Sequence, residues 1–200
     1  MPVKNAALFL EECLISIVNQ SEYEWELIAI DDHSIDKSLE ILKHFSEKDS
    51  RIKVFENTGN GIIEALRLAY KKSSGELIHR MDADDIMPPE KLEILKTNLV
   101  KKGKGFLATG KVKYFNINKV SNGYLKYQDW MNCLIDRESQ WEEIYKECVI
   151  ASPGWLIHKE DLDKCEAFHP NQYPEDYDLV FRFYKYGIKV ISIDEVLHLW

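Results

Sequence analysis

The sequence predicts an α/β fold, in which a mostly parallel sheet is covered by helices on both faces. Segments with apolar residues at helical spacing alternate along the chain with short apolar runs. The run at residues 27–30 is apolar throughout, as expected of a strand that is buried on both faces. Clusters of acidic residues directly follow two of the predicted strands. The carboxyl ends of strands are where α/β folds bind ligands.

Helices and strands are predicted to alternate through the first half of the chain. In residues 7–19, Leu10, Leu14 and Ile17 lie on one helical face, and Asn5 is a candidate cap. Further helices are predicted at 35–47 and 62–73, the latter with Gly75 as its C-cap, and strands at 27–30, 52–55 and 76–81.

The pattern continues with a helix that Pro88 and Pro89 open and Gly103 ends, and with one or two strands in residues 106–115. It weakens after about residue 116, where the chain is rich in aromatic residues. That composition suits a substrate-facing subdomain and a core equally well. The aromatic residues concerned are Trp130, Trp141, Tyr145 and Trp155.

The composition limits the classes of partner. The chain has 200 residues, of which 45% are hydrophobic, and a net charge of -8. This acidic balance argues against a nucleic-acid binder. No apolar run is long enough for a transmembrane helix, and the start shows no signal-peptide pattern. The four cysteines are scattered, which favours reduced thiols in a cytoplasmic protein.

The run Asp82-Ala83-Asp84-Asp85 follows the strand predicted at 76–81. Three carboxylates at the end of a buried strand repel one another, and a hard divalent cation, alone or carrying a phosphate, offsets that repulsion. Asp31 and Asp32 follow another strand, so both acidic loops are predicted at the same edge of the sheet. The alternative is a solvated polar loop that caps the next helix.

Five segments, taken in order, resemble the motifs of the family 2 glycosyltransferases, which have the GT-A fold. The acidic run with Arg80 and Met81 is similar to the D-x-D-D form of the family's D-x-D motif. The other four are residues 1–5, similar to P-V-x-N; 31–36, similar to D-D-x-S-x-D; 60–61 with 74–76, similar to the stretch before the metal strand; and 173–179, similar to E-D-x-x-L. Together they cover nearly the whole chain.

The resemblance implies one GT-A domain over residues 1–200. Residues up to about 110 would form the nucleotide-sugar-binding half, and about 111–200 the acceptor-side half. In the family the first strand begins several residues before the position of Pro2, and a basic segment often follows the position of Trp200. We therefore expect the chain to be trimmed at both ends.

The resemblance implies transfer of a sugar, with inversion, from a nucleotide-diphosphate sugar to an acceptor hydroxyl. UDP is the favoured nucleotide, because Asp31 and Asp32 would accept hydrogen bonds from the uracil N–H and the ribose. One of this pair, or Ser34, is also expected to cap the following helix. Pro2 and Asn5 would line the base pocket.

Mg²⁺ or Mn²⁺ is the expected cofactor, because all the implied ligands are oxygens. Asp84 is the main candidate ligand, and Asp82 would reach the metal through water or bind the ribose. Asp85 would support these ligands without binding the metal itself, or would brace the helix that begins at Pro88. Arg80 would pair with phosphate or, equally, with Asp82 or Asp85.

The base that activates the acceptor is predicted to be Asp176, with Glu175 beside it. On spacing alone, Pro174 followed by two acids is an ordinary helix start. His198 is a further candidate metal or phosphate ligand, and Trp155 would stack on an acceptor sugar or pack in the core. Residues 177, 180, 181 and 184 are predicted to face the core, and Asp178 and Arg182 to pair on the surface.

The sequence therefore predicts an enzyme of cell-surface glycan or polysaccharide synthesis, acting on a glycan or lipid-linked acceptor in the cytoplasm or at the inner face of the membrane, with peripheral membrane contact. Two alternatives remain. A nucleotidyltransferase would carry a glycine-rich, basic phosphate loop near the start, and residues 2–7 offer none. A non-catalytic nucleotide-sugar-binding module would have damaged acidic motifs, whereas here they are intact.

Overall fold

The computed structural model describes residues 1–115, 120–169 and 173–200. A first sheet, of three parallel strands, is built by the amino-terminal part of the chain. Its middle strand has every residue buried, as its continuous apolar sequence predicts. In order across the sheet the strands are β1 (Pro2–Val3), β2 (Leu27–Asp31) and β3 (Ile52–Glu56).

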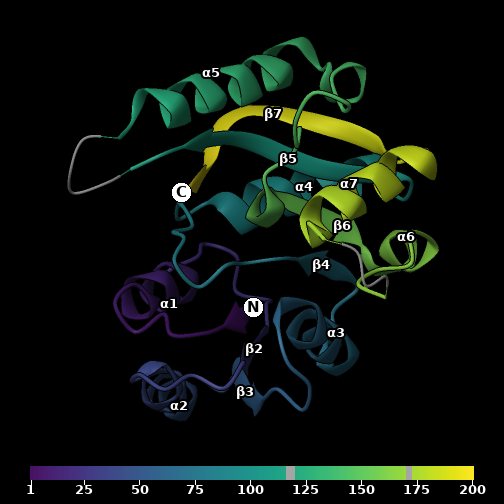
Figure 1. The fold of residues 1–200 in the computed structure, drawn as a ribbon. Coiled ribbons are helices and arrows are strands. Elements are labelled where there is room, and N and C mark those ends of the chain that lie inside the picture. Colours follow the sequence, from purple (N-terminus) through teal and green to yellow (C-terminus); the bar gives the residue numbers. More distant parts are fainter. Residues whose placement is uncertain (116–119, 170–172) are drawn as a thin grey trace.

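Helices cover both faces of this first sheet. Figure 1 shows α1 (Leu10–Val18) and α2 (Ser38–Lys48) on one side of the strands and α3 (Ile62–Lys72) on the other. Each helix connects one strand to the next, so the carboxyl ends of the three strands lie at a common edge. The loops at that edge carry the acidic pair Asp31 and Asp32.

The second sheet has four strands and is mixed, whereas a mostly parallel arrangement was predicted. Strand β6 enters between β4 and β5 from the short 3-10 turn Ser152–Gly154 and runs antiparallel to both, while β5 and β7 are parallel. In order across the sheet the strands are β4 (Leu77–His79), β6 (Trp155–His158), β5 (Phe106–Lys113) and β7 (Lys189–Leu199).

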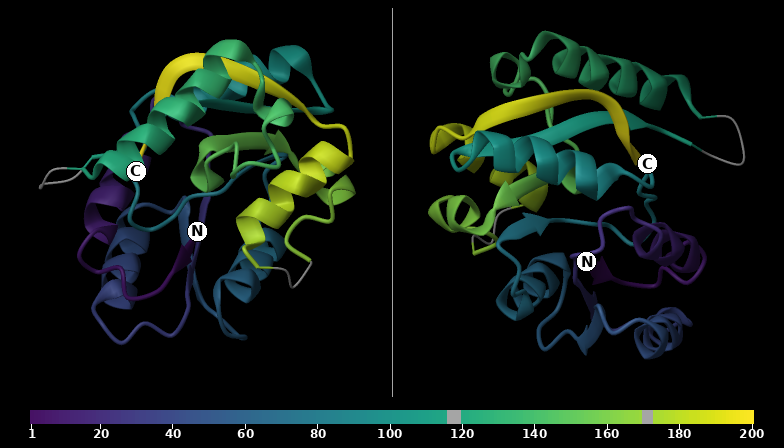
Figure 2. Two further views of the ribbon diagram at one scale, coloured as in Figure 1. Left: turned by 45° about the horizontal axis from the view of Figure 1, so that its top comes forward. Right: turned by 180° about the vertical axis from the view of Figure 1, so that it is seen from behind.

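Two long helices sandwich the second sheet. Helix α5 (Asn122–Arg137) lies across the outer face of β5 and β7, and α4 (Lys91–Lys102) packs on the opposite face (Figure 2). Helices α6 (Lys159–Lys164) and α7 (Glu175–Lys185) complete this part, together with the 3-10 turn Gln140–Glu142. The largest cluster of buried apolar residues lies here and includes Leu107, Ile157 and Phe183. None of the described helices is long and apolar enough to cross a membrane.

The α/β class is confirmed, and several helix ends differ from prediction. Helix α2 begins at Ser38 because the carboxylate of Asp36 accepts a hydrogen bond from the Ser38 amide at 2.9 Å; neither Asp32 nor Ser34 caps it. Helix α1 begins at Leu10 without a side-chain cap, so Asn5 is not its cap. Helix α3 ends at Lys72 with Ser73 as its C-cap, so the predicted Gly75 is not the cap. Gly103, at φ 82°, ends α4 as predicted.

Candidate active site

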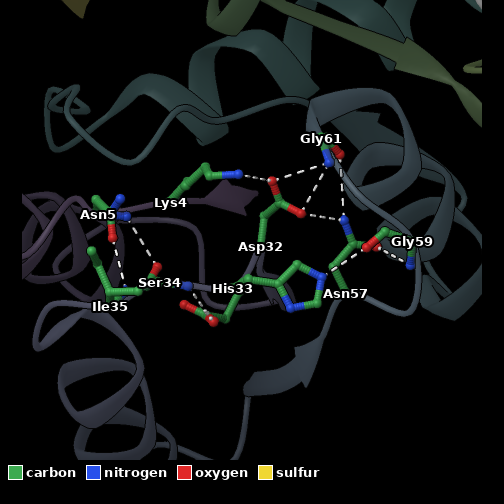
Figure 3. A network of polar contacts seen from close by, with 10 residues as sticks. Lys4, Asn5, Asp32, His33, Ser34, Ile35, Asn57, Gly59 and Gly61 are labelled. Carbon is green, nitrogen blue, oxygen red and sulfur yellow. Dashed lines mark hydrogen bonds and ion pairs between the residues drawn. The ribbon is translucent and has the colours of Figure 1, made fainter.

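Asp32, which directly follows β2, is surrounded by hydrogen-bond donors from two other segments, the loop after β1 and the loop after β3 (Figure 3). Its carboxylate accepts bonds from Lys4 Nζ at 3.0 Å, Asn57 Nδ2 at 2.6 Å and the Gly61 amide at 3.0 and 3.1 Å. Burial raises the pKa of Asp32, but these bonds outweigh burial, and the pKa lies below its usual value. Asp32 is therefore an ionised brace that joins β1, β2 and the loop after β3.

Gly61 is required at its position in this brace. It has φ 86° and ψ 170°, a conformation that is essentially restricted to glycine. In this conformation the Gly61 amide points at Asp32, and α3 begins at the next residue. Asn57 completes the loop, because its side-chain oxygen accepts a bond from the Gly59 amide at 3.1 Å.

Asp31 differs from its neighbour in having a free oxygen. It is 3% exposed, and its Oδ2 accepts a bond from the Ser34 amide at 3.1 Å. Its Oδ1 is buried and has no hydrogen-bond partner among the described residues. A buried carboxylate oxygen without a donor is costly, so this atom is suited to accept an N–H or O–H from a ligand.

Asn5 ties the loop after β1 to the loop after β2. The side-chain oxygen of Asn5 accepts a bond from the Ile35 backbone amide at 2.9 Å, and the backbone amide of Asn5 donates to Ser34 Oγ at 3.0 Å. Asn5 adopts φ 51°, a left-handed conformation that asparagine tolerates. Pro2 lies in β1, paired with Ile30. Both residues thus flank the acidic pair, and their role in lining a base pocket stays a prediction.

The three carboxylates of residues 82–85 have different surroundings. Asp84 is exposed, Asp82 is intermediate and Asp85 is buried. Burial, with the charges of Asp85 and Asp82, raises the pKa of Asp84. Burial and the Asp82 charge also raise the pKa of Asp85, to about 7. The turn therefore concentrates negative charge, and only Asp84 and Asp82 present it outward.

Asp85 faces a buried cluster of basic groups. Its Oδ2 lies 3.2 Å from His198 Nε2, and His198 Nδ1 lies 3.1 Å from Lys91 Nζ, which donates to the Pro153 carbonyl at 2.7 Å. Burial and the neighbouring Lys91 charge hold the pKa of His198 well below its usual value, so the ring is neutral. His198 is 1% exposed. Its Nδ1 faces Lys91 and its Nε2 faces Asp85, and Nε2 has no hydrogen-bond partner among the described residues. The role of His198 as a metal or phosphate ligand stays a prediction.

Lys91 was not singled out from the sequence, although a signal existed. It lies four and eight residues before Leu95 and Leu99, on the face of α4 that is buried. A lysine at such a position needs partners inside the protein. Burial lowers its pKa to about 7, while the Asp85 charge acts in the opposite direction.

Arg80 joins the acidic turn to the start of α7. Its side chain is 4% exposed, and its Nε lies 3.1 Å from Asp82 Oδ1, while its other end lies 3.0 Å from Glu175 Oε1. Of the two predicted roles, the structure shows the ion pair, with Asp82 and not with Asp85. Two motifs separated by some ninety residues of sequence are thereby held at one place.

Asp176 lies beside this junction. Its Oδ1 accepts a bond from the Tyr177 amide at 2.8 Å, and its side chain is partly exposed. Burial, and next the Asp176 charge, raise the pKa of Cys148 to about 12, which places the carboxylate near that thiol as well. Unlike Glu175, Asp176 forms no ion pair that the structure records among the described residues.

Trp155 belongs to the core, which was one of its two predicted roles. It is 1% exposed, and its ring meets that of Phe183 edge-to-face at 5.7 Å. It is therefore not available to stack on an acceptor sugar. Tyr184, in contrast, was predicted to face the core, but its side chain is 41% exposed.

The residues at the acidic turn fit a divalent cation only in part. No cluster of three His, Cys, Asp or Glu side chains able to hold a metal occurs in the part of the chain that the structure describes. Asp84 and Asp82 do offer outward-facing carboxylate oxygens, the donors that Mg²⁺ and Mn²⁺ prefer. An ion bound there would take its remaining ligands from a substrate or from water.

Comparisons with known proteins show which fold and family the chain resembles. An uncharacterised glycosyltransferase of Haemophilus influenzae is 42% identical over 94 residues, which cover 46% of this chain and 38% of that protein. Two solved structures cover all of the chain: a Pyrobaculum calidifontis mannosyltransferase in complex with GDP-Man and Mn²⁺ (TM-score 0.78, 18% identity, 55% of that chain) and S. aureus TarS in complex with UDP (TM-score 0.74, 20% identity, 58% of that chain).

These neighbours confirm the predicted GT-A fold. The chain spans well under two thirds of the length of each of these three proteins. The model of the family named Glycosyl transferase family 2 matches residues 1–165, which is most of the sequence and includes four of the five motifs. The chain belongs to glycosyltransferase family 2.

Proposed function

We propose that this chain transfers a sugar from a UDP-sugar to an acceptor hydroxyl of a glycan, with inversion and with Mn²⁺ or Mg²⁺ bound at the acidic turn. The observation that carries the proposal is the position of Arg80. It holds Asp82, from the candidate donor side, next to Glu175, from the candidate acceptor side. A transferase needs its donor diphosphate and its acceptor hydroxyl within reach of one another.

The donor base would bind at the end of β2. Asp31 has a buried oxygen without a donor, and a uracil N–H would satisfy it. Asp32 contributes indirectly, because it fixes the loops on either side through Lys4 and Gly61. The UDP complex of a protein with the same fold supports a uridine nucleotide here.

The diphosphate would lie at the acidic turn, held through a divalent cation by Asp84 and Asp82. The cation supplies a Lewis acid that stabilises the leaving diphosphate. Asp85 would not be a ligand, since it is buried against His198. Arg80 orients Asp82 through their ion pair.

Asp176 would remove the proton from the acceptor hydroxyl. A base must have a free carboxylate oxygen at the reacting centre. Glu175 is engaged by Arg80, whereas one oxygen of Asp176 remains after its bond to the Tyr177 amide. Asp176 is therefore the better candidate of the two.

A thermal-shift experiment tests the donor part. UDP, GDP and dTDP are compared in Mn²⁺ and in EDTA. We expect UDP to stabilise the protein most, and only with metal, because Asp82 and Asp84 alone repel a diphosphate. Equal stabilisation by UDP in EDTA and in Mn²⁺ would rule out the metal-binding role of the acidic turn.

The variant Asp176→Asn tests the base. It keeps the size of the side chain and removes the proton acceptor. We expect single-turnover transfer to fall by roughly 10²–10⁴ with unchanged donor affinity, the usual share of general-base catalysis. If Asp176 only stabilises the helix start, the variant loses about 0.3–1 kcal/mol of stability and transfers normally.

A further inference from the structure

Five aromatic side chains lie in one connected group on the outer side of α7. Tyr177, Phe181 and Tyr184 follow one face of the helix at four- and three-residue spacing, and Trp141 and Tyr145 pack on them from the preceding segment. Ring centroids of neighbours are 4.7 to 6.4 Å apart. We call this group the aromatic strip.

Two rings of the strip are exposed, and two others are anchored by hydrogen bonds. Tyr145 is 78% exposed and Tyr184 is 41% exposed, and their rings contact each other. Tyr177 donates its hydroxyl to the Ile144 carbonyl at 2.9 Å, and Trp141 Nε1 donates to the Ile188 carbonyl at 2.9 Å. A ligand would therefore meet rings that are largely held in place, with little loss of conformational entropy.

The strip is continuous with the candidate catalytic base. Tyr177 directly follows Asp176, and Tyr184 lies seven residues further, which is about 10 Å along a helix. The strip thus runs away from the reacting centre over the length of a short oligosaccharide.

The charge around the strip favours a neutral ligand. Residues 141–147 and 175–185 together contain six acidic and three basic side chains. Two of the bases are paired with acids, Lys146 with Glu143 and Arg182 with Asp178. Such a negatively charged surface repels a chain of phosphates. Neutral sugar rings can stack their apolar faces on aromatic rings without electrostatic repulsion.

We propose that the aromatic strip binds the acceptor glycan as a neutral chain of sugar rings, and that it guides the terminal hydroxyl to Asp176. This inference rests on the proposed function, since it assigns the ligand of the acceptor side. It also assigns stacking to the exposed Tyr145 and Tyr184, in contrast to the buried Trp155.

Binding of defined oligosaccharides tests the proposal without donor or metal. Cello-, laminari- and malto-oligosaccharides of increasing length are titrated by calorimetry against the wild type and against Tyr145→Ala and Tyr184→Ala. Tyr23→Ala is the matched control, because Tyr23 is also 78% exposed and lies outside the strip. Exposed substitutions of this kind leave the fold intact, which melting temperatures verify.

We expect at least one neutral series to bind, with affinity that rises with length, and each strip variant to weaken it about tenfold while Tyr23→Ala does not. The proposal is overturned if no series binds at millimolar concentration, if the strip variants bind as the wild type does, or if a poly(ribitol phosphate) probe binds more tightly than the neutral sugars. Metal-dependent stabilisation by UDP, measured on the same samples, shows separately whether the proposed donor site holds.

Discussion

Arg80→Met tests whether the acidic turn and the start of α7 form one electrostatic unit. The substitution keeps an apolar side chain of similar length and removes the only charge that lies between Asp82 and Glu175 in the described structure. Arg80 is 4% exposed on its side chain, Glu175 is 15% and Asp82 is 25%. These groups are shielded from water, so the loss of their shared cation leaves two uncompensated carboxylates.

The expected cost follows from that burial. Removing one partner of a buried ion pair costs about 3–5 kcal/mol, and the partial exposure of Asp82 places this variant at the lower end, about 3 kcal/mol. For a domain of this size the melting temperature of the metal-free protein should then fall by about 6–12 °C. A divalent cation can replace part of the lost positive charge. Mn²⁺ should therefore raise the melting temperature of Arg80→Met by more than it raises that of the wild type.

The assay is thermal denaturation of both proteins in EDTA and across a Mn²⁺ titration. Arg51→Met serves as the control, because Arg51 pairs with Asp49 at 2.6 Å, forms no ion pair with the acidic turn among the described residues, and is 30% exposed on its side chain. It should lose at most about 1 kcal/mol and leave the effect of Mn²⁺ unchanged. If Mn²⁺ stabilises Arg80→Met no more than the wild type, Arg80 and the proposed metal ligands are not coupled, and the reasoning fails.

Three further variants probe the acidic turn (Asp84), the loop that braces Asp32 (Gly61) and the residue before the amino-terminal end of β2 (Glu26). Asp84→Asn should abolish stabilisation by Mn²⁺ with UDP. The metal-free melting temperature should stay unchanged or rise, because burial and two neighbouring carboxylates raise the pKa of Asp84. A fall of many degrees would show that Asp84 has a structural role instead. Gly61→Ala should lower the free energy of unfolding by about 1–3 kcal/mol, because alanine does not readily adopt the backbone conformation of Gly61. The control Gly123→Ala lies in α5 at a negative φ and should not destabilise the protein. Equal urea midpoints for the two variants would contradict this. Burial raises the pKa of Glu26, but bonds from Lys53 and Ser74 lower it to about 2, so the stability that these bonds contribute is present above pH 4.5 and is lost as the pH falls through about 2. Glu26→Gln should therefore be less stable than the wild type at pH 7 in urea, and a difference that stays constant down to pH 2 would refute the assignment.

The acidic loops could be predicted from the sequence because their chemistry is local. Adjacent carboxylates after an apolar run indicate a charged site near a strand end, and Asp31 is the last residue of β2. Asp84 lies in a turn five residues after β4, and β4 belongs to the second sheet, so the expected common edge of one sheet is not what the structure shows. The different roles of the carboxylates within each loop could not be predicted. Asp32 is a brace only because Lys4, from the loop after β1, and Asn57 and Gly61, from the loop after β3, reach it.

The aromatic residues show a second limit of sequence reasoning. Periodicity predicts that Tyr177, Phe181 and Tyr184 share a face of a helix, and they do. It does not show which face is covered, because that depends on the packing of segments distant in sequence. Trp155 is buried since β6 enters the middle of the second sheet, an arrangement that the strand pattern did not indicate.

The same dependence on distant partners explains why three carboxylates within four residues have three different environments. Strand β7 returns to the acidic turn, where the Ile86 and Leu199 amides and carbonyls bond each other at 3.0 and 3.1 Å. This bridge places His198, and behind it Lys91, against Asp85. A buried cation near Asp85 lowers the cost of its charge inside the protein. Asp82 pairs with Arg80, and Asp84 forms no ion pair among the described residues. The outward-facing charge of these two carboxylates is therefore the part of the turn that an external cation would neutralise.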